Sequence, residues 1–381
     1  METSLKNKIL IVPAWYPCSF FKEQADLLQP DCDVKILSGV MHQIGFAQAL
    51  VKSCIGKCTI VQKSDYTSID FYYISNLRSV FITKQLEYLT EKIGEIILNL
   101  FGGEKPDAIH IQSISDIAVF VTRWAKKQGI RVVLTEHILF VRHEINRFSK
   151  LRENLYNEVD EVMCVSNYLY RNLLTSGFKM KHVSVIGNLV NDKYIQQDRI
   201  FKKNGRVLFV ANHYHDKGLD TLFEVIKQLQ NKIDCVVDIV GLDRTSHFNE
   251  FSTIDDMVKK YDIERNICLL GKIAHDDLLR LYPQYSVLLS TSTSETFGLA
   301  VAESIMYGTK VVCTDSGGIR DFVNDKHGII VGLNNVGELV EAIIKSLEHS
   351  QMNEESLGII REKFGAKNYK SKLISIYINE N

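Results

Sequence analysis

The chain has 381 residues, a length that predicts two domains rather than one. Hydrophobic residues make up 45% and charged residues 24%, which excludes a disordered, collagen-like or purely coiled-coil chain. Lysine and arginine (45) nearly balance aspartate and glutamate (46), so the net charge of −1 gives no overall basic footprint for nucleic acid.

The N-terminal residues lack the order of a secretory signal peptide, and no apolar run approaches the ~18–20 residues of a membrane span. The close pair Cys54 and Cys58 lacks the partners that would complete a zinc site. Four other cysteines lie in apolar, strand-like runs and are expected to be buried free thiols: Cys164, Cys235, Cys268 and Cys313. We therefore expect a cytoplasmic protein.

Short apolar runs alternate with helical stretches along the first half of the chain. The clearest helical period spans residues 77–101, and the predicted strands are 8–12, 34–38, 68–74, 108–111, 131–136, 161–165 and 183–186. Residues 193–204 are polar and without period. We expect them to link an N-terminal domain, residues 1–192, to a second domain.

A second alternating series follows this linker. Its predicted strands are 206–210, 235–240, 267–270, 287–290, 310–314 and 328–331. Its predicted helices are 218–231, 252–261, 275–283, 298–307, 318–323 and 337–348. Such alternation is typical of parallel sheets covered on both faces.

The pattern therefore predicts an α/β protein of two doubly wound, Rossmann-like domains that face a ligand-binding cleft. The C-terminal domain would comprise residues 205–355. Residues 356–381 are amphipathic, and we expect a helical segment there that crosses back to the N-terminal domain.

Residues 290–308 contain more candidate functional residues than any other segment of the chain. A hydroxyl-rich turn enters a helix near Gly298, so the amides of residues 297–299 would point out of a helix N-terminus that favours an anion. Glu303 would place a charge on an apolar helix, which is costly unless donors such as sugar hydroxyls bind it. The structural alternative is that Glu295 caps the helix and Glu303 pairs with a lysine.

This stretch resembles the Glu-x7-Glu signature of retaining, nucleotide-sugar-dependent glycosyltransferases of family 4, which have the GT-B fold. Glu295 and Glu303 match the two glutamates, and Phe-Gly-Leu follows the first. Further matches occur in the family's order, at 165–166, 185–188, 216–218, 240–241, 270–273 and 306–321. Residues 13–24 resemble the opening of bacterial polysaccharide-assembly members.

The resemblance implies a donor site with three catalytic residues. Glu295 would hold the sugar hydroxyls near C3, and Lys217 would neutralise the diphosphate leaving group, whose charge grows at the transition state. His137 would contact the donor sugar across the cleft. Plainer interpretations of the last two are a solvated lysine at a helix start and a structural histidine.

The resemblance also implies the binding contacts to the donor. Glu303 would bind the ribose hydroxyls, and Lys272 and Ile273 would lie along the base. The other expected donor contacts are Asn212, Gly241, Phe297, Gly298 and Leu299. No metal or other cofactor is expected, because Lys217 and helix N-termini would take the place of a metal.

Three departures from the family pattern weaken parts of this assignment. Asn212 stands where arginine is usual, five residues before the lysine of Lys-Gly, and it brings no charge. Asp321 replaces the common glutamate of the Gly-Gly loop, and residues 18–20 carry no glycine where the family has a Gly-rich loop.

The acceptor side is less defined by the sequence. Residues 140–156 interleave basic and apolar side chains, which suits either an anionic membrane leaflet or an ordinary amphipathic helix with a solvated basic face.

By resemblance, we expect a bacterial hexosyltransferase that uses a nucleotide-diphosphate sugar, UDP first. Its acceptor would be a saccharide or lipid-linked saccharide in capsule or lipopolysaccharide synthesis, with possible contact to the inner membrane leaflet and no nucleic acid. A non-catalytic partner subunit of the same fold and a nucleotide-sugar epimerase are the alternatives.

Overall fold

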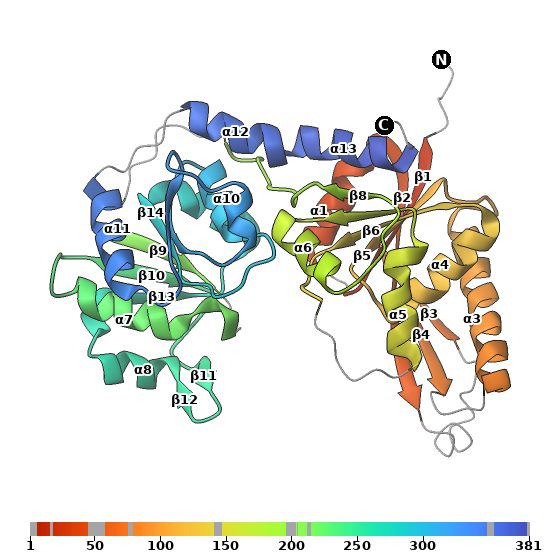
Figure 1. Ribbon diagram of the computed structural model, residues 1–381, viewed down its shortest axis with the longest axis horizontal. Helices are drawn as coiled ribbons and strands as arrows, with labels where there is room; N and C mark the ends of the chain where they lie inside the picture. Colours follow the sequence, from red (N-terminus) through yellow and green to blue (C-terminus); the bar gives the residue numbers. More distant parts are fainter. Residues whose placement is uncertain are drawn as a thin grey trace. The chain divides into compact units, whose positions relative to one another are not determined.

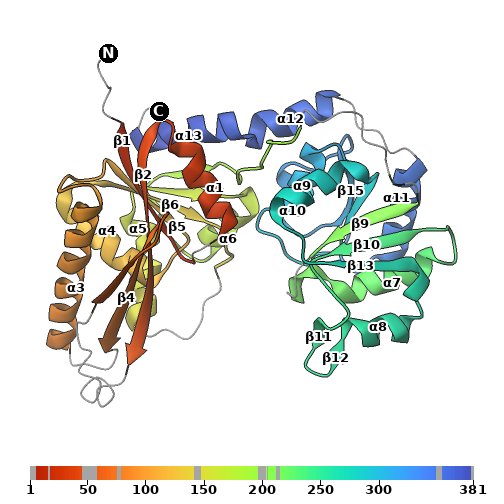
Figure 2. The same ribbon diagram turned by 180° about the vertical axis from the view of Figure 1, so that it is seen from behind.

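The computed structural model describes residues 6–15, 18–44, 58–74, 79–140, 147–195, 203, 205–211, 215–348 and 354–378. The chain divides into two units, each with its own sheet (Figures 1 and 2). The first unit comprises Met1–Ile186 and Lys370–Asn381, and the second comprises Gly187–Tyr369. Within the described residues, no helix is both long and apolar enough to cross a membrane.

The first unit is built on an eight-stranded sheet of order β3-β4-β2-β1-β5-β6-β7-β8. Neighbouring strands run parallel except β3 and β4, which are antiparallel. The strands are β1 (Asn7–Pro13), β2 (Cys32–Ile44), β3 (Cys58–Gln62), β4 (Thr67–Ile74), β5 (Ala108–Gln112), β6 (Arg131–Glu136), β7 (Glu161–Cys164) and β8 (Val183–Val185). The helices are α1 (Ser19–Leu28), α3 (Ser79–Leu100), α4 (Asp116–Gln128), α5 (Arg147–Glu158), α6 (Asn167–Thr175) and α13 (Ala366–Ile378).

Helices cover both faces of this sheet, so its central strands are buried on both sides (Figure 1). Ile109 and Ile111 of β5 face a core that α3, α4 and α5 complete. Because side chains alternate along a strand, His110 and Gln112 point to the opposite face. There His110 meets a side chain of α13 and Gln112 meets one of α1.

The second unit has a six-stranded parallel sheet of order β13-β10-β9-β14-β15-β16 and a two-stranded antiparallel hairpin, β11-β12. The strands are β9 (Arg206–Val210), β10 (Val236–Val240), β11 (His247–Asn249), β12 (Ser252–Thr253), β13 (Ile267–Gly271), β14 (Val287–Ser290), β15 (Lys310–Thr314) and β16 (Gly328–Val331). The α-helices are α7 (Leu219–Leu229), α8 (Ile254–Tyr261), α9 (His275–Leu281), α10 (Leu299–Met306), α11 (Val336–Glu348) and α12 (Glu354–Phe364). Single 3-10 turns are η1 (His215–Lys217), η2 (Glu264–Asn266), η3 (Tyr282–Gln284) and η4 (Gly318–Asp321).

Each parallel sheet contains one point at which the chain reverses its direction of winding. In the first unit the chain adds β2 on one side of β1 and later β5 on the other. In the second unit it adds β10 on one side of β9 and later β14 on the other. The loops beyond the carboxyl ends of the strands separate at such points, which is where open α/β sheets bind ligands.

The predicted α/β fold with two parallel, doubly wound sheets is confirmed, and five strands have the bounds that the sequence predicts. The prediction missed β3, a short antiparallel edge strand, and the hairpin β11-β12, whose residues are mostly polar. The predicted helix 318–323 is the shorter 3-10 turn η4. Of the four cysteines expected to be buried, Cys268 is only half-buried, because it lies on the edge strand β13.

The division between the units lies before the expected linker, between Ile186 and Gly187. Residues just after this point bond to the second unit: the amide of Val190 donates to the carbonyl of Phe364 at 3.0 Å, and Tyr307 donates to the carbonyl of Asn191 at 3.0 Å. Most of residues 193–204 lie outside the described residues. The C-terminal residues from Lys370 onward group with the first unit.

The packing of α3 on α4 predicts opposite effects for the same substitution at two helical glycines. A Cβ on Gly94 of α3 would lie 2.0 Å from Nε1 of the buried Trp124, whereas a Cβ on Gly358 of α12 would meet nothing within 4 Å. Gly94→Ala should therefore overpack the core and cost about 1–3 kcal/mol of stability. Gly358→Ala should add up to about 1 kcal/mol through helix propensity. Scanning calorimetry measures both, and a stabilised Gly94→Ala variant would contradict the packing.

Candidate active site

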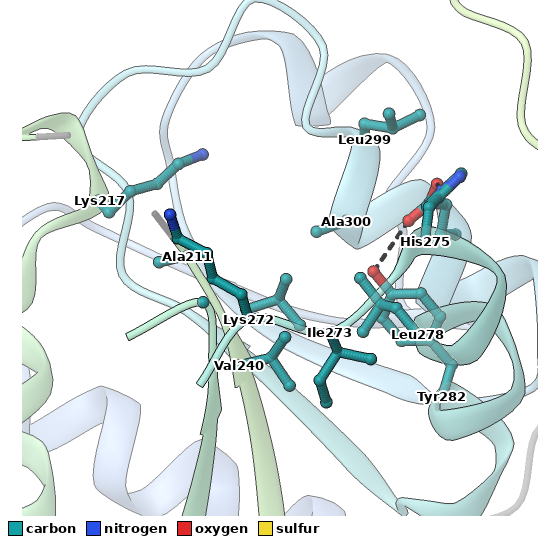
Figure 3. A pocket seen from close by; sticks show the side chains of 13 residues that line it. Ala211, Lys217, Val240, Lys272, Ile273, His275, Leu278, Tyr282, Leu299 and Ala300 are labelled. Atoms are coloured by element: carbon teal, nitrogen blue, oxygen red, sulfur yellow. Dashed lines mark hydrogen bonds and ion pairs between the residues drawn. The ribbon is translucent and has the colours of Figure 1, made fainter. Parts of the chain in front are cut away.

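A pocket of about 690 Å³ opens in the second unit at the carboxyl ends of β9 and β10, next to the point where the winding reverses. Its walls come from the ends of these strands, from the loop before α9, and from the first turns of α10 (Figure 3). The lining residues are Val210, Ala211, Lys217, Val240, Gly241, Lys272, Ile273, His275, Leu278, Tyr282, Leu299, Ala300 and Glu303.

Lys217 reaches the pocket because the loop after β9 lies directly against the loop after β14. Gly218 has a φ of +62°, and a Cβ there would lie 2.0 Å from the carbonyl oxygen of Thr291. The Thr291 hydroxyl donates to the carbonyls of Lys217 and Gly218, both at 2.9 Å. This close backbone approach fixes the start of the lysine side chain.

Glu295 lies outside the pocket lining but pairs directly with the pocket lysine. Lys217 Nζ is 2.6 Å from Glu295 Oε1, and the Ser292 hydroxyl donates to the same oxygen at 2.8 Å. Both charged side chains are largely buried, with 24% and 17% of their surfaces exposed. A charge pair so far removed from water is held more strongly than one on the open surface.

The backbone at Glu295 is fixed by the loop that follows β15. The Glu295 amide donates to Ser316 at 2.7 Å, and its carbonyl accepts from Gly318 at 2.8 Å. A Cβ on Gly318 would lie 2.1 Å from the carbonyl oxygen of Thr296, so this contact requires glycine. The Gly-Gly motif therefore acts by letting two loops touch, and Asp321 lies just beyond it, at the end of η4.

Glu303 is a buried carboxylate whose side chain is 4% exposed. Its Oε1 lies 2.6 Å from His275 Nε2, and Tyr282, which is fully buried, donates its hydroxyl to Oε2 at 2.9 Å. Burial raises the pKa of Tyr282 well above its ordinary value, and the adjacent Glu303 carboxylate raises it further. Tyr282 thus stays a neutral donor to Glu303.

Helix α10 brings Glu303 to the pocket and directs its own first turn there. Gly298 precedes the helix with a φ of +89°, and Leu299, Ala300 and Glu303 lie on the pocket wall. The first amides of a helix have no carbonyl partners within it and favour an anion. Phe297 contributes its side chain elsewhere: it is 2% exposed and packs against Phe322 and Phe364.

The pocket has a cationic side and an acceptor side. Lys217 and Lys272 extend into it from one side, and His275 and Tyr282 lie on the other, where a dashed line joins Tyr282 to Glu303 (Figure 3). Within the described residues Lys272 forms no ion pair, in contrast to Lys217. The site is therefore suited to a ligand that is anionic at one end and offers hydroxyl groups at the other.

The structure brings most of the predicted donor residues together around this pocket. Six line it directly: Lys217, Gly241, Lys272, Ile273, Leu299 and Glu303. Glu295 joins them through its contact with Lys217. Asn212 lies outside the described residues, and His137 belongs to the first unit.

His137 follows β6 at the carboxyl edge of the first sheet, and two buried side chains hold it. Its amide donates to Glu136 Oε1 at 2.8 Å, and its ring nitrogen Nε2 lies 2.7 Å from Gln112 Oε1. Glu136 also accepts from Ser113 at 2.8 Å and from Tyr156 at 2.8 Å, so its carboxylate is well compensated. The position of His137 is therefore determined both at its backbone and at its ring.

Gln112 belongs to a buried polar cluster between β5, α1 and α13. Its Nε2 donates to Gln24 Oε1 at 2.6 Å. His110, which is fully buried, lies 2.6 Å from the Tyr377 hydroxyl through Nδ1 and 2.7 Å from Thr135 Oγ1 through Nε2. This cluster connects the C-terminal helix to the strand that holds His137.

Sequence reasoning missed His275 and Tyr282 as site residues, and it missed Gln112 and His110. Their signals were present but weak. His275 follows two other pocket residues by a few positions, and the polar Gln112 is the last residue of a buried strand, at the carboxyl end where open α/β sheets bind ligands. In the sequence Tyr282 has the pattern of an aromatic core residue, and only the structure shows that its hydroxyl donates to Glu303.

The sequence contains one Asp-x-Asp spacing, Asp31-Cys32-Asp33, a pattern that serves divalent cations in other transferases. These residues stand at the amino end of β2, away from the carboxyl edge of the sheet. Asp31 pairs with Lys370 at 2.6 Å and Asp33 with Lys35 at 3.1 Å. Over the part of the chain that the structure describes, no group of three acidic, histidine or cysteine side chains is arranged to hold a metal ion.

Comparisons with known proteins identify the family and the fold. The sequence model of the family described as Glycosyl transferases group 1 matches residues 190–370, and that of Glycosyltransferase Family 4 matches residues 75–194. The structure of Anabaena HepE in complex with UDP superposes with a TM-score of 0.71 at 16% identity, covering 98% of this chain and all of that one. The chain belongs to the group 1 glycosyltransferases. Its two Rossmann-like units are those of the GT-B fold.

Curated relatives of this group 1 glycosyltransferase are distant. One subunit of the human phosphatidylinositol N-acetylglucosaminyltransferase is 26% identical over 65% of this chain, which spans only 51% of that protein. An uncharacterised protein from the cps region of Klebsiella pneumoniae is 22% identical over 74% of this chain and 80% of its own length. The chain thus spans about half the length of its first curated relatives.

The buried cluster in the first unit predicts a pH dependence of stability. Burial lowers the pKa of His110 to about 3, and His137 adds a smaller effect in the same direction. Between the unfolded value of 6.5 and 3 the unfolded chain binds one more proton, so stability is lost as the pH falls through this window. The slope for one proton is at most about 1.4 kcal/mol per pH unit.

Urea unfolding of the wild type and of His110→Asn between about pH 5 and 7 measures this slope. The variant should have a flatter pH dependence, whatever its absolute stability, because asparagine does not titrate. Equal slopes for the two proteins would contradict a neutral, buried His110.

Proposed function

We propose that this glycosyltransferase transfers a sugar from a nucleotide-diphosphate sugar, with UDP as the nucleotide, to a hydroxyl group of a saccharide or lipid-linked saccharide, with retention at the anomeric carbon. The observation that carries the proposal is Glu303, a buried carboxylate on the pocket wall. Retention and the division of roles among residues follow from the family resemblance.

Glu303 retains capacity for a sugar-like ligand. An ionised carboxylate offers about four acceptor sites. His275 and Tyr282 each contact one of its oxygens, at 2.6 Å and 2.9 Å. A ribose would place two neighbouring hydroxyl donors at the remaining acceptor sites. The structural alternative, in which Glu303 pairs with a lysine, is wrong, because Glu303 pairs with His275.

The cationic side of the pocket fits the diphosphate. In the proposed reaction the bond between the anomeric carbon and the diphosphate oxygen breaks, and negative charge grows on the diphosphate. The acceptor oxygen bonds to that carbon, and its hydroxyl proton passes to the departing diphosphate. Lys217, Lys272 and the first turn of α10 line the same pocket, which supports a role for the two lysines and the first amides of α10 in stabilising this charge. We propose that they do so without a divalent metal.

The UDP assignment draws on HepE, whose solved structure contains UDP. The acceptor assignment draws on the Klebsiella relative, whose gene lies in a cps region, and it supports a role in surface polysaccharide synthesis. Contact with the inner membrane leaflet remains part of the proposal. Of the basic segment proposed for it, residues 141–146 lie outside the described residues.

The deciding experiment is a calorimetric screen of UDP-, GDP- and ADP-sugars, followed by transfer assays with and without chelator. Saturable binding of a UDP-sugar, slow hydrolysis of that sugar and transfer in the presence of chelator are expected. Lack of binding to any of these sugars would favour a non-catalytic partner subunit. Conversion of the sugar without an acceptor would favour an epimerase, and activity restored only by Mg²⁺ or Mn²⁺ would refute the metal-free mechanism.

Replacing each of the two glutamates by glutamine should affect different properties, UDP binding in one case and turnover in the other. Glu303→Gln should weaken UDP binding by about 10- to 100-fold, because hydrogen bonds to a charged group contribute about 1.5–3 kcal/mol. Glu295→Gln should lower kcat but leave UDP affinity unchanged or higher, since it releases Lys217. Calorimetry with UDP and initial rates measure both effects.

Glu341→Gln, on an exposed position of α11, makes the same chemical change away from the pocket and serves as the matched control. It should alter neither UDP affinity nor turnover. If Glu303→Gln and Glu295→Gln produced equal, small losses like those of the control, the two glutamates would be structural.

A further inference from the structure

The ring of His137 is held on three sides within the first unit. Gln112 Oε1 lies 2.7 Å from its Nε2, and the rings of Phe20 and Phe21 on α1 contact it edge-on, with centroids 5.4 and 5.6 Å away. A half-buried histidine that needs only to be solvated requires no such arrangement. The geometry therefore restricts both the orientation of the ring and the chemical state of Nε2.

The neighbours of the Gln112 side-chain amide determine whether its oxygen or its nitrogen faces His137. Its Nε2 faces two acceptors, Gln24 Oε1 at 2.6 Å and His110 Nδ1 at 3.4 Å. With the amide nitrogen on that side, the carbonyl oxygen Oε1 is left to face His137. Because a carbonyl oxygen only accepts, the His137 nitrogen in contact with it must carry the proton.

His110 can act as that acceptor because it is neutral. Among the described residues His110 is fully buried with no carboxylate partner, and its Nδ1, 2.6 Å from the hydroxyl of Tyr377 on α13, can accept from that hydroxyl. Its Nε2–H then donates to Thr135 at 2.7 Å, so both ring nitrogens are satisfied. This assignment of protons satisfies all of the contacts just described, from Tyr377 on α13 to His137.

We propose that Gln112 is a positioning residue that holds His137 as the Nε2–H tautomer, with its own orientation fixed by Gln24, neutral His110 and Tyr377. The lone pair of His137 is then on Nδ1, where it can accept from a donor-sugar hydroxyl. The last step rests on the proposed function, in which His137 contacts the donor sugar. The tautomer itself does not depend on it.

The tautomer can be read directly by NMR in the full-length protein labelled with ¹⁵N at histidine. The signals of His137 are assigned by their loss in His137→Ala. In the wild type at neutral pH they should show a protonated Nε2 and an unprotonated Nδ1. Gln112→Leu removes the acceptor at similar size and should give a mixture of tautomers. Gln112→Glu, which offers only acceptor oxygens, should favour the doubly protonated ring.

Steady-state kinetics then measure how the tautomer of His137 affects sugar transfer. Gln112→Leu should lower kcat by up to about 100-fold, the effect of a misplaced reacting contact, with little change in the affinity for UDP. Tyr377→Phe removes one hydroxyl and should shift His137 in the same direction by less. Thr90→Val serves as control, because it deletes a buried hydroxyl of the same unit that bonds only to the carbonyl of Leu86 at 2.7 Å.

A wild-type His137 protonated at Nδ1, or a Gln112→Leu variant with an unchanged tautomer, would overturn the inference. A variant that only melts at a lower temperature while its His137 signals stay as in the wild type would do so as well. If the wild type showed the expected tautomer but transferred no sugar, the proposed function would fail and the positioning role of Gln112 would stand.

Discussion

The burial of the Glu303 carboxylate is the constraint on which much of the second unit depends, because removing a charge from water costs free energy. An ionised carboxylate inside a protein is tolerated only with hydrogen-bond donors around it. Helix α10 is apolar and supplies none, so the donors come from the neighbouring α9 and η3, as His275 and Tyr282. These elements thereby form one wall of the pocket. The same two side chains, His275 and Tyr282, therefore compensate the buried charge and shape the pocket.

The opposite wall depends on close backbone contact rather than on charge. Gly218 and Gly318 each lie where a Cβ would overlap a carbonyl oxygen, so the loops after β9, β14 and β15 touch one another directly. Only this contact lets Lys217 meet Glu295, which is far away in the sequence. The glycines of these loops therefore position Lys217 on this wall together with Glu295, which pairs with it from outside the pocket lining.

The sequence predicted the elements that carry strong apolar patterning and the residues that carry a spaced motif. Strand β14 and the helix that brings Glu303 to the pocket both have these signals, and both were placed well. The hairpin β11-β12 was missed because polar residues make up most of it, and β3 was missed because it is a short edge strand with only Ile60 and Val61 as an apolar run. His275 and Gln112 were missed because hydrogen bonding between distant segments defines their roles, and spacing along the chain does not encode it.

The ion pair between Lys217 and Glu295 gives the proposed donor site an internal order of events. In the free pocket each charge satisfies the other, at 2.6 Å and largely out of water. A diphosphate carries two or more negative charges and competes with Glu295 for the lysine. In the proposed reaction Lys217 would turn to the diphosphate, and the sugar hydroxyls would then donate to Glu295 in its place. A nucleotide without a sugar would leave Glu295 with the Ser292 hydroxyl but without the lysine, so the proposed full donor would satisfy the site better than its nucleotide alone. On this proposal, the pair of Lys217 and Glu295 would favour the intact donor over the nucleotide that remains after transfer.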